Sequence, residues 1–271
     1  NYMKLFKSII FYTIAGLILF NMVSCKKDET IRYGNVTMGN RVNGKFISDQ
    51  GNTFNLVEIN AKINFDKFRR GIMQCDVLRQ TGEKEYDVRV TYLDTVLTKA
   101  PVMASAIEED SDKKVQDPIH IEQYWVSGGY LNMYVVFEIQ IDPMLKDSKH
   151  MVNLVLDDSA STEGTYTFAL HHNAFGETFK QKEPEELVPD VNPMADDSIN
   201  WGFAGSYVSF PIADLIEEKE AKIVLKWKSH IITDFAWSAK VEDKTREFLY
   251  SKDSFEHAPL HIKTKTAAQV R

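Results

Sequence analysis

The sequence predicts an all-β protein, with a small N-terminal closed barrel followed by a larger C-terminal β-sandwich. Apolar and polar residues alternate with a period of two, most clearly in YLNMYVVFEIQI (130–141), which is typical of a strand with one buried face. Strong turn signals such as Asn43-Gly44 separate such runs, because both central positions of a type I′ turn need positive φ. Helical pattern is scarce. It suggests one turn at 94–99 and one short helix at 211–220, opened by a proline.

The chain divides into two units at an acidic stretch. Residues 32–101 hold about five strands, which suits a closed barrel, and the OB fold is one solution. Residues 102–115 contain EEDSDKK and are expected to form a linker. Residues 116–271 follow with seven or eight strands, enough for two sheets packed face to face. Within them, 119–126 is expected to pair with 130–141 through the turn Ser127-Gly128-Gly129.

The first 24 residues have the pattern of a lipoprotein signal peptide. Lys4 and Lys7 precede an apolar run from Ile9 to Val23, 15 residues long. This run is too short to cross a bilayer, which needs about 20 residues at helical rise. It ends in Met22-Val23-Ser24-Cys25, which resembles a bacterial lipobox, although methionine departs from the usual first residue. We therefore expect cleavage before Cys25 and lipidation of its thiol, in preference to a plain signal peptide or an uncleaved anchor.

Residues 25–31 would then form a tether at the mature N-terminus. Lys26-Lys27-Asp28-Glu29 resembles the signal by which some Gram-negative bacteria export lipoproteins to the cell surface. The outer membrane is the expected location, and this charge pattern leaves its periplasmic and outer sides equally open.

Charge and cysteine content exclude several classes. The chain from residue 25 onward holds 30 basic and 39 acidic side chains, a net charge of −9, which argues against nucleic acid as a partner. Lys67, Arg69 and Arg70 form a small basic cluster that could meet anionic lipid headgroups. Cys75 is left as the only thiol and is expected to be buried and inert, so no internal disulfide forms.

No motif for catalysis, metal binding or a cofactor is present in the sequence. It lacks GxSxG, HExxH and paired CxxC, and its paired carboxylates lie in expected loops. Asp117, His120 and Glu122, and the neighbours His171 and His172, are interpreted as surface or turn residues and not as metal ligands. Tyr124 and Trp125 lie on opposite faces of a strand, so one of them is a candidate aromatic platform for sugar or peptide.

Several segments resemble the NigD-like lipoproteins. They are VTMGNRVNGKFISDQGNTFNL (36–56), YDVRVTYLDTVLTKAPV (86–102), DPIHIEQYWVSGGYLNMYVVF (117–137), HMVNLVLDD (150–158) and YTFALHHNAFGE (166–177). The resemblance implies an N-terminal OB domain and a C-terminal immunoglobulin-like β-sandwich. It makes a bacteriocin-immunity or accessory role conceivable, and it carries over no site residue.

We therefore expect a non-catalytic, lipid-anchored envelope protein without a cofactor, which binds or helps assemble a protein or peptide partner. The alternative is a surface lipoprotein that binds glycans for nutrient capture. An enzyme would need a site built by folding from residues that share no local motif.

Overall fold

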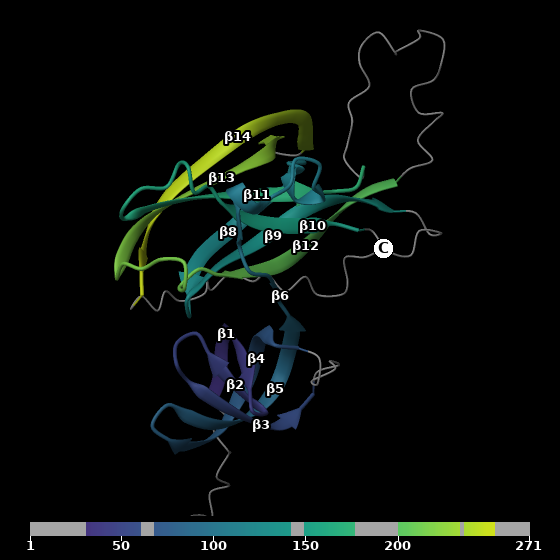
Figure 1. Ribbon diagram of the computed structural model, residues 1–271. Helices are drawn as coiled ribbons and strands as arrows, with labels where there is room; N and C mark the ends of the chain where they lie inside the picture. Colours follow the sequence, from purple (N-terminus) through teal and green to yellow (C-terminus); the bar gives the residue numbers. More distant parts are fainter. Residues whose placement is uncertain (1–30, 61–67, 142–148, 177–199, 234–235, 253–271) are drawn as a thin grey trace, which may run out of the picture. The chain divides into compact units, whose positions relative to one another are not determined.

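The computed structural model describes residues 31–60, 68–141, 149–176, 200–233 and 236–252. The chain divides into residues 1–32 and a compact unit of residues 33–271, which holds the barrel and the sandwich. The regular elements of the described residues are β-strands and two short 3₁₀ turns, and the predicted fold class is confirmed (Figure 1). No helix among them is long and apolar enough to cross a membrane.

Five strands close the N-terminal barrel in the order β1-β2-β3-β5-β4. Their bounds are β1 Ile31–Val42, β2 Lys45–Ser48, β3 Thr53–Ile59, β4 Arg70–Gly82 and β5 Glu85–Thr95. The predicted hairpin turn joins β1 and β2, with Asn43 at φ 51° and Gly44 at φ 79°. The barrel core contains Phe46, Phe54, Met73, Cys75, Val88 and Val90.

Two sheets form the sandwich. The five-stranded sheet has the order β14-β13-β11-β10-β7, and the four-stranded sheet has the order β6-β12-β9-β8. The strand bounds are β6 Leu97–Thr98, β7 Val102–Met103, β8 His120–Ser127, β9 Tyr130–Ile141, β10 Met151–Leu156, β11 Thr165–Asn173, β12 Asn200–Pro211, β13 Glu220–Thr233 and β14 Ala236–Ser251. Apolar residues of both sheets meet in one core, among them Leu131 and Met133 of β9 and Phe168 of β11.

The hairpin of β8 and β9 forms as expected. The two strands pair antiparallel from His120↔Val136 to Ser127↔Tyr130. Gly128 and Gly129 turn the chain between them with φ of 56° and 82°. The alternation in β9 places Leu131, Met133 and Val135 in the core, as the period of two predicts.

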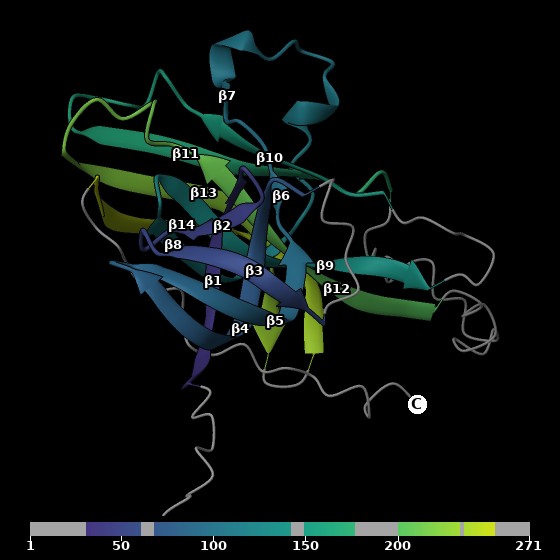
Figure 2. The ribbon, with the colours of Figure 1, turned by 90° about the horizontal axis from the view of Figure 1, so that it is seen from below.

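The stretch between barrel and sandwich differs from the expectation of one turn at 94–99 and a linker at 102–115. β6 pairs in parallel with β12, and β7 pairs in parallel with β10, so both sandwich sheets begin within these residues. The 3₁₀ turns η1 (Ala104–Ala106) and η2 (Asp112–Lys114) follow, in a loop that extends from the sheet beside β7 and β10 (Figure 2). Strands of two residues carry no detectable period, which is why the pattern missed them.

The expected helix at 211–220 is also wrong, because β12 ends at Pro211 and a turn leads to β13. Ile212 and Ala213 donate backbone hydrogen bonds to the Gly129 carbonyl oxygen, at 3.0 and 3.1 Å. Ile212 and Ile216 are fully buried. Burial of these two side chains favours the observed turn over the helix that the sequence pattern suggested.

Candidate functional site

The predicted lipidation site lies outside the described residues. This holds for Cys25, for the lipobox residues Met22, Val23 and Ser24, and for the export signal Lys26, Lys27, Asp28 and Glu29. They remain sequence-based predictions.

The predicted aromatic platform does not form from Tyr124 and Trp125. Trp125 is only 5% exposed and belongs to a cluster with Met38, Ile72 and Val96. Tyr124 is half-buried against the sandwich core, with its ring centroid 5.1 Å from that of Phe248. Trp125 is therefore a packing contact between residues of the barrel and of the sandwich. A single-strand pattern could not reveal this, because the partner residues come from distant strands.

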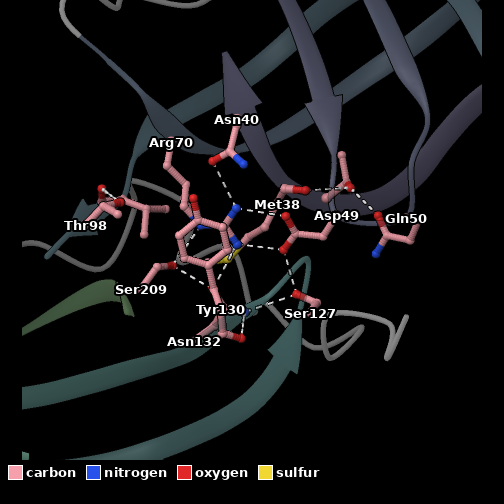
Figure 3. A network of polar contacts seen from close by, with 12 residues as sticks. Met38, Asn40, Asp49, Gln50, Arg70, Thr98, Ser127, Tyr130, Asn132 and Ser209 are labelled. Carbon is pink, nitrogen blue, oxygen red and sulfur yellow. Dashed lines mark hydrogen bonds and ion pairs between the residues drawn. The ribbon is translucent and has the colours of Figure 1, made fainter. Parts of the chain in front are cut away.

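Arg70 is the centre of a buried polar network (Figure 3). It stands at the start of β4, is 2% exposed, and makes a bidentate pair with Asp49 through Nη1–Oδ1 at 2.8 Å and Nη2–Oδ2 at 2.6 Å. The ring of Tyr130 stacks on the guanidinium, with 3.9 Å between the ring centroid and Cζ. The idea that Arg70 belongs to a basic surface cluster is therefore wrong. Arg69 is exposed, and Lys67 lies outside the described residues.

The same network joins the barrel to the four-stranded sheet. Arg70 donates from Nε to Ser209 Oγ of β12 at 3.0 Å and from Nη2 to Asn132 Oδ1 of β9 at 3.0 Å. Ser127 Oγ donates to Asp49 Oδ2 at 2.6 Å, and Ser209 Oγ donates to Asn132 Oδ1 at 2.6 Å. Each charge is paired and hydrogen-bonded, as burial requires, so the network ties the barrel to the sandwich and leaves no reactive group exposed.

His171 and His172 are neither surface nor turn residues, since both are buried in β11. His171 donates from Nδ1 to the Lys113 carbonyl oxygen at 2.7 Å and accepts at Nε2 from the Gln116 amide at 3.0 Å. Its two ring nitrogens therefore hold the loop that carries η2 against the sheet.

His172 points into the sandwich. It donates from Nδ1 to the Pro118 carbonyl oxygen at 3.0 Å, and its Nε2 lies 2.9 Å from Nδ1 of His150. Burial and the neighbouring His150 lower the pKa of His172 to about 4, so the ring is neutral at pH 7. The ring of Phe137 stacks on His150 at 4.2 Å between centroids. This pair is a core contact, and no group of three potential ligands for a metal ion occurs among the described residues.

Cys75 is buried in the barrel core, as predicted. Burial raises the pKa of its thiol to about 12, which keeps it protonated and unreactive at neutral pH.

A hollow of about 310 Å³ lies on the outer face of the five-stranded sheet. Val155 and Ala169 line it together with Lys226, Lys228 and Asp243. Its volume is at the lower end of the range of about 300–1,000 Å³ typical of ligand sites. Its lining carries charges of both signs, so the hollow selects neither anions nor cations.

An aromatic surface that the sequence did not indicate lies on the outer face of the four-stranded sheet. Phe203 and Tyr207 share that face of β12, and Tyr134 of β9 packs on Tyr207 with 4.7 Å between ring centroids. The Tyr134 ring crosses Gly205, where an added Cβ would lie 2.1 Å from its hydroxyl.

Two of its aromatic rings are open to solvent. Phe203 is 56% exposed and Tyr92 of β5 is 42% exposed. Burial and then the hydrogen-bonded Asp94 raise the pKa of Tyr92, and the Tyr134 hydroxyl is close enough to add to this shift. We call Tyr92, Tyr134, Phe203 and Tyr207 the aromatic surface. Its members come from β5, β9 and β12, so no local sequence signal could have found it.

Comparison with known protein families identifies one similar domain in the chain. Residues 102–185 match the family described as the NigD-like C-terminal β-sandwich domain. This match confirms the predicted resemblance to the NigD-like proteins. No functionally curated protein matches the chain.

Solved structures share the fold. A Bacteroides vulgatus protein of unknown function has a TM-score of 0.56 and 16% identity, covering 84% of this chain and 95% of that one. A NigD-like immunity protein from Bacteroides caccae has a TM-score of 0.54 and 16% identity, with 81% and 97% covered. A putative lipoprotein from Bacteroides fragilis has a TM-score of 0.51 and 14% identity, with 81% and 97% covered.

Proposed function

Because the chain carries a NigD-like C-terminal β-sandwich domain, we propose that it is a non-catalytic, lipid-anchored envelope protein that binds a protein or peptide partner. The observation that carries the proposal is the aromatic surface. Large exposed apolar patches next to polar groups mark interaction sites, and tyrosine is enriched in such sites. Phe203 and Tyr92 supply exposed rings, and the hydroxyls of Tyr134 and Tyr207 supply polar atoms.

A binding role fits the chemistry of the described residues better than catalysis does. Cys75 is buried and protonated, and His171 and His172 use their ring nitrogens in structural contacts. The buried charges of Arg70 and Asp49 form an ion pair with each other. A catalytic site needs a nucleophile or base within reach of a substrate, and these groups are enclosed.

The membrane anchor is proposed from Cys25 and its lipobox. A structural neighbour described as a putative lipoprotein supports it. Acyl chains buried in the bilayer hold such a protein at about 0.8 kcal/mol for each methylene group. The neighbour described as a NigD-like immunity protein makes immunity or an accessory function the role we favour for the partner interaction. We place the protein at the outer membrane, with the side left to experiment.

Glycan binding at the same surface is the second candidate. Flat aromatic faces stack on sugar rings. Burial raises the pKa of Tyr207 most, the neighbouring Tyr134 and Tyr92 follow, and the carboxyl groups of Glu122 and Asp94 are close enough to add to the shift. Such carboxylates could accept hydrogen bonds from sugar hydroxyls.

Site-specific crosslinking in cells tests the proposal. A photoreactive residue replaces Phe203 in one variant and Leu249 in the control, because Leu249 is 81% exposed on the outer face of β14. We expect a discrete protein adduct at position 203 and none at 249. Equal labelling at both positions, or no adduct at 203, contradicts partner binding at the aromatic surface. Retention of one sugar class on a glycan array, lost in Phe203→Ala, establishes the second candidate instead.

A further inference from the structure

Among the strands that the structure describes, only a short one covers the outer edge of β12. On one side β12 pairs with β9 over the whole strand, from Asn200↔Ile141 to Pro211↔Tyr130 without a register shift. On the other side the only described strand is β6, which pairs with Val208 and Ser209 alone. An edge of this kind presents backbone donors and acceptors to any chain that approaches it.

The backbone groups that face this edge can be identified. Lys99 N donates to the Ser209 carbonyl oxygen at 3.2 Å, so the carbonyl of Ser209 points toward β6. In a regular strand the N–H and C=O of one residue point to the same side, and successive residues alternate. The N–H and C=O of Tyr207 and Gly205 therefore point toward the same edge, whereas those of Ser206 and Ala204 bond to β9.

Both edges of the five-stranded sheet are protected. β14 is an edge strand that carries charged residues along its length, among them Lys240, Glu242, Asp243, Lys244, Arg246 and Glu247. The edge of β10 beyond β7 is capped by Lys99, whose Nζ donates to the Val152 carbonyl oxygen at 3.0 Å and to Asn153 Oδ1 at 2.6 Å. Such lysines and charges are the usual means of preventing strand addition.

β12 has none of these devices along its open part. Its sequence, NWGFAGSYVSFP, contains no charged residue, and its single proline is the last residue. Gly202, Ala204 and Ser206 face the sandwich interior and are small, which leaves room for the side chains of an added strand. On the outer face, such a strand would lie beside Gly205 and Tyr207, next to the aromatic surface.

We propose that β12 binds its partner by strand addition, so that an extended segment of a partner protein pairs with the part of the β12 edge that β6 leaves unpaired. This inference rests on the proposed partner-binding function and names its mode. Main-chain hydrogen bonds to Gly205 and Tyr207 supply the affinity, and the alternate side chains of the segment supply selectivity.

The local charges define the chemistry of this segment. Its inward side chains are uncharged, because they enter the apolar margin of the sandwich. Its outward side chains avoid aspartate and glutamate, because the chain from residue 25 onward already holds 39 acidic against 30 basic side chains. An acidic segment would be repelled.

Selection from a phage-displayed library of random short peptides, combined with amide hydrogen exchange, tests this mode. In the free chain we expect the amides of Gly205 and Tyr207 to exchange faster than those of Ala204 and Ser206. Selected peptides should be poor in Asp and Glu and should slow exchange at Gly205 and Tyr207. If these two amides are already as protected as their neighbours in the free chain, another segment covers the edge and the proposal is overturned.

Two matched variants separate the mode from the function. Ser206→Lys places an inward-pointing charge on the β12 edge and should weaken the selected peptides at least about tenfold, a change of about 1.4 kcal/mol. Thr245→Lys adds a lysine to the exposed outer face of the β14 edge, away from β12, and should leave binding unaltered. Thermal unfolding of both variants establishes that they are folded.

The remaining outcomes overturn the proposal in distinguishable ways. Peptides that bind without protecting Gly205 and Tyr207, or that tolerate Ser206→Lys, refute strand addition and leave partner binding intact. Concentration-dependent self-association that protects the same amides identifies a second copy as the occupant. Failure to select any peptide, together with no adduct at position 203 in cells, refutes the mode and the proposed function alike.

Discussion

Replacing Arg70 by methionine would remove the cation from the buried network and leave Asp49 without its partner. The side chains of Arg70 and Asp49 are 1% and 2% exposed, so water cannot substitute for the lost guanidinium. Ser127 remains as a donor to Asp49 Oδ2, while Ser209 and Asn132 each lose a hydrogen bond from Arg70. Breaking a buried ion pair by removing one partner costs about 3–5 kcal/mol.

Chemical denaturation measures this loss as a change in the free energy of unfolding. With about 2–4 °C for each kcal/mol in a chain of this size, the melting temperature should fall by about 6–20 °C. Arg79→Met is the matched control. Arg79 pairs with Asp87 with its side chain 72% exposed, and an exposed pair contributes less than about 1 kcal/mol.

The double variant Arg70→Met with Asp49→Leu completes the test. Replacing both charges with apolar groups of similar volume removes the uncompensated carboxylate, so the double variant should be more stable than Arg70→Met alone. The reasoning is refuted if Arg70→Met costs no more than Arg79→Met, or if the effects of the two network substitutions simply add.

Three further predictions concern a turn, a histidine and the anchor. Gly128→Ala places a Cβ 2.5 Å from Asp49 Oδ1 at a φ of +56°, so it should destabilise the chain more than Gly44→Ala, where φ is +79° and no atom lies within 4 Å. Equal losses of unfolding free energy for the two variants in denaturant would contradict the clash. His172 has a pKa lowered to about 4 in the folded chain, so its contribution to stability is complete above the unfolded pKa of about 6.5 and is lost as pH falls from there toward 4, a total of about 3 kcal/mol. His172→Phe should therefore flatten the dependence of the unfolding free energy on pH between about 6.5 and 4, and an unchanged pH profile would refute the assignment. Cys25→Ser should abolish metabolic labelling with a fatty acid and release the protein from membranes, whereas labelling that persists would show that the lipid is attached elsewhere.

The strands could be predicted because their signal is local. In β9, Leu131, Met133 and Val135 alternate with polar neighbours, and the period of two fixes which side faces the core. The Asn43-Gly44 and Gly128-Gly129 turns are equally local, since positive φ at a given position favours those residue types. The burial of Cys75 is consistent with Met73 and Val77, the apolar residues two positions away on either side, which join it in the barrel core.

The candidate site could not be predicted, because each part of it depends on contacts between distant residues. Arg70 stands beside Arg69 in a basic stretch, and only the approach of Ser209, 139 residues away, shows that it is buried. Trp125 was a candidate for exposure because its strand has two faces. The barrel residues Met38 and Ile72 cover the outer one.

By itself, the sequence determined the all-β class, the strand faces and the hairpin turns, because each depends on the preferences of neighbouring residues. The tertiary structure alone decided which polar groups are buried together, which aromatic rings stay exposed and which strand edge the described strands leave open. Those properties belong to surfaces assembled from several strands. A period of two cannot say which strands become neighbours, nor what remains uncovered at the end of a sheet.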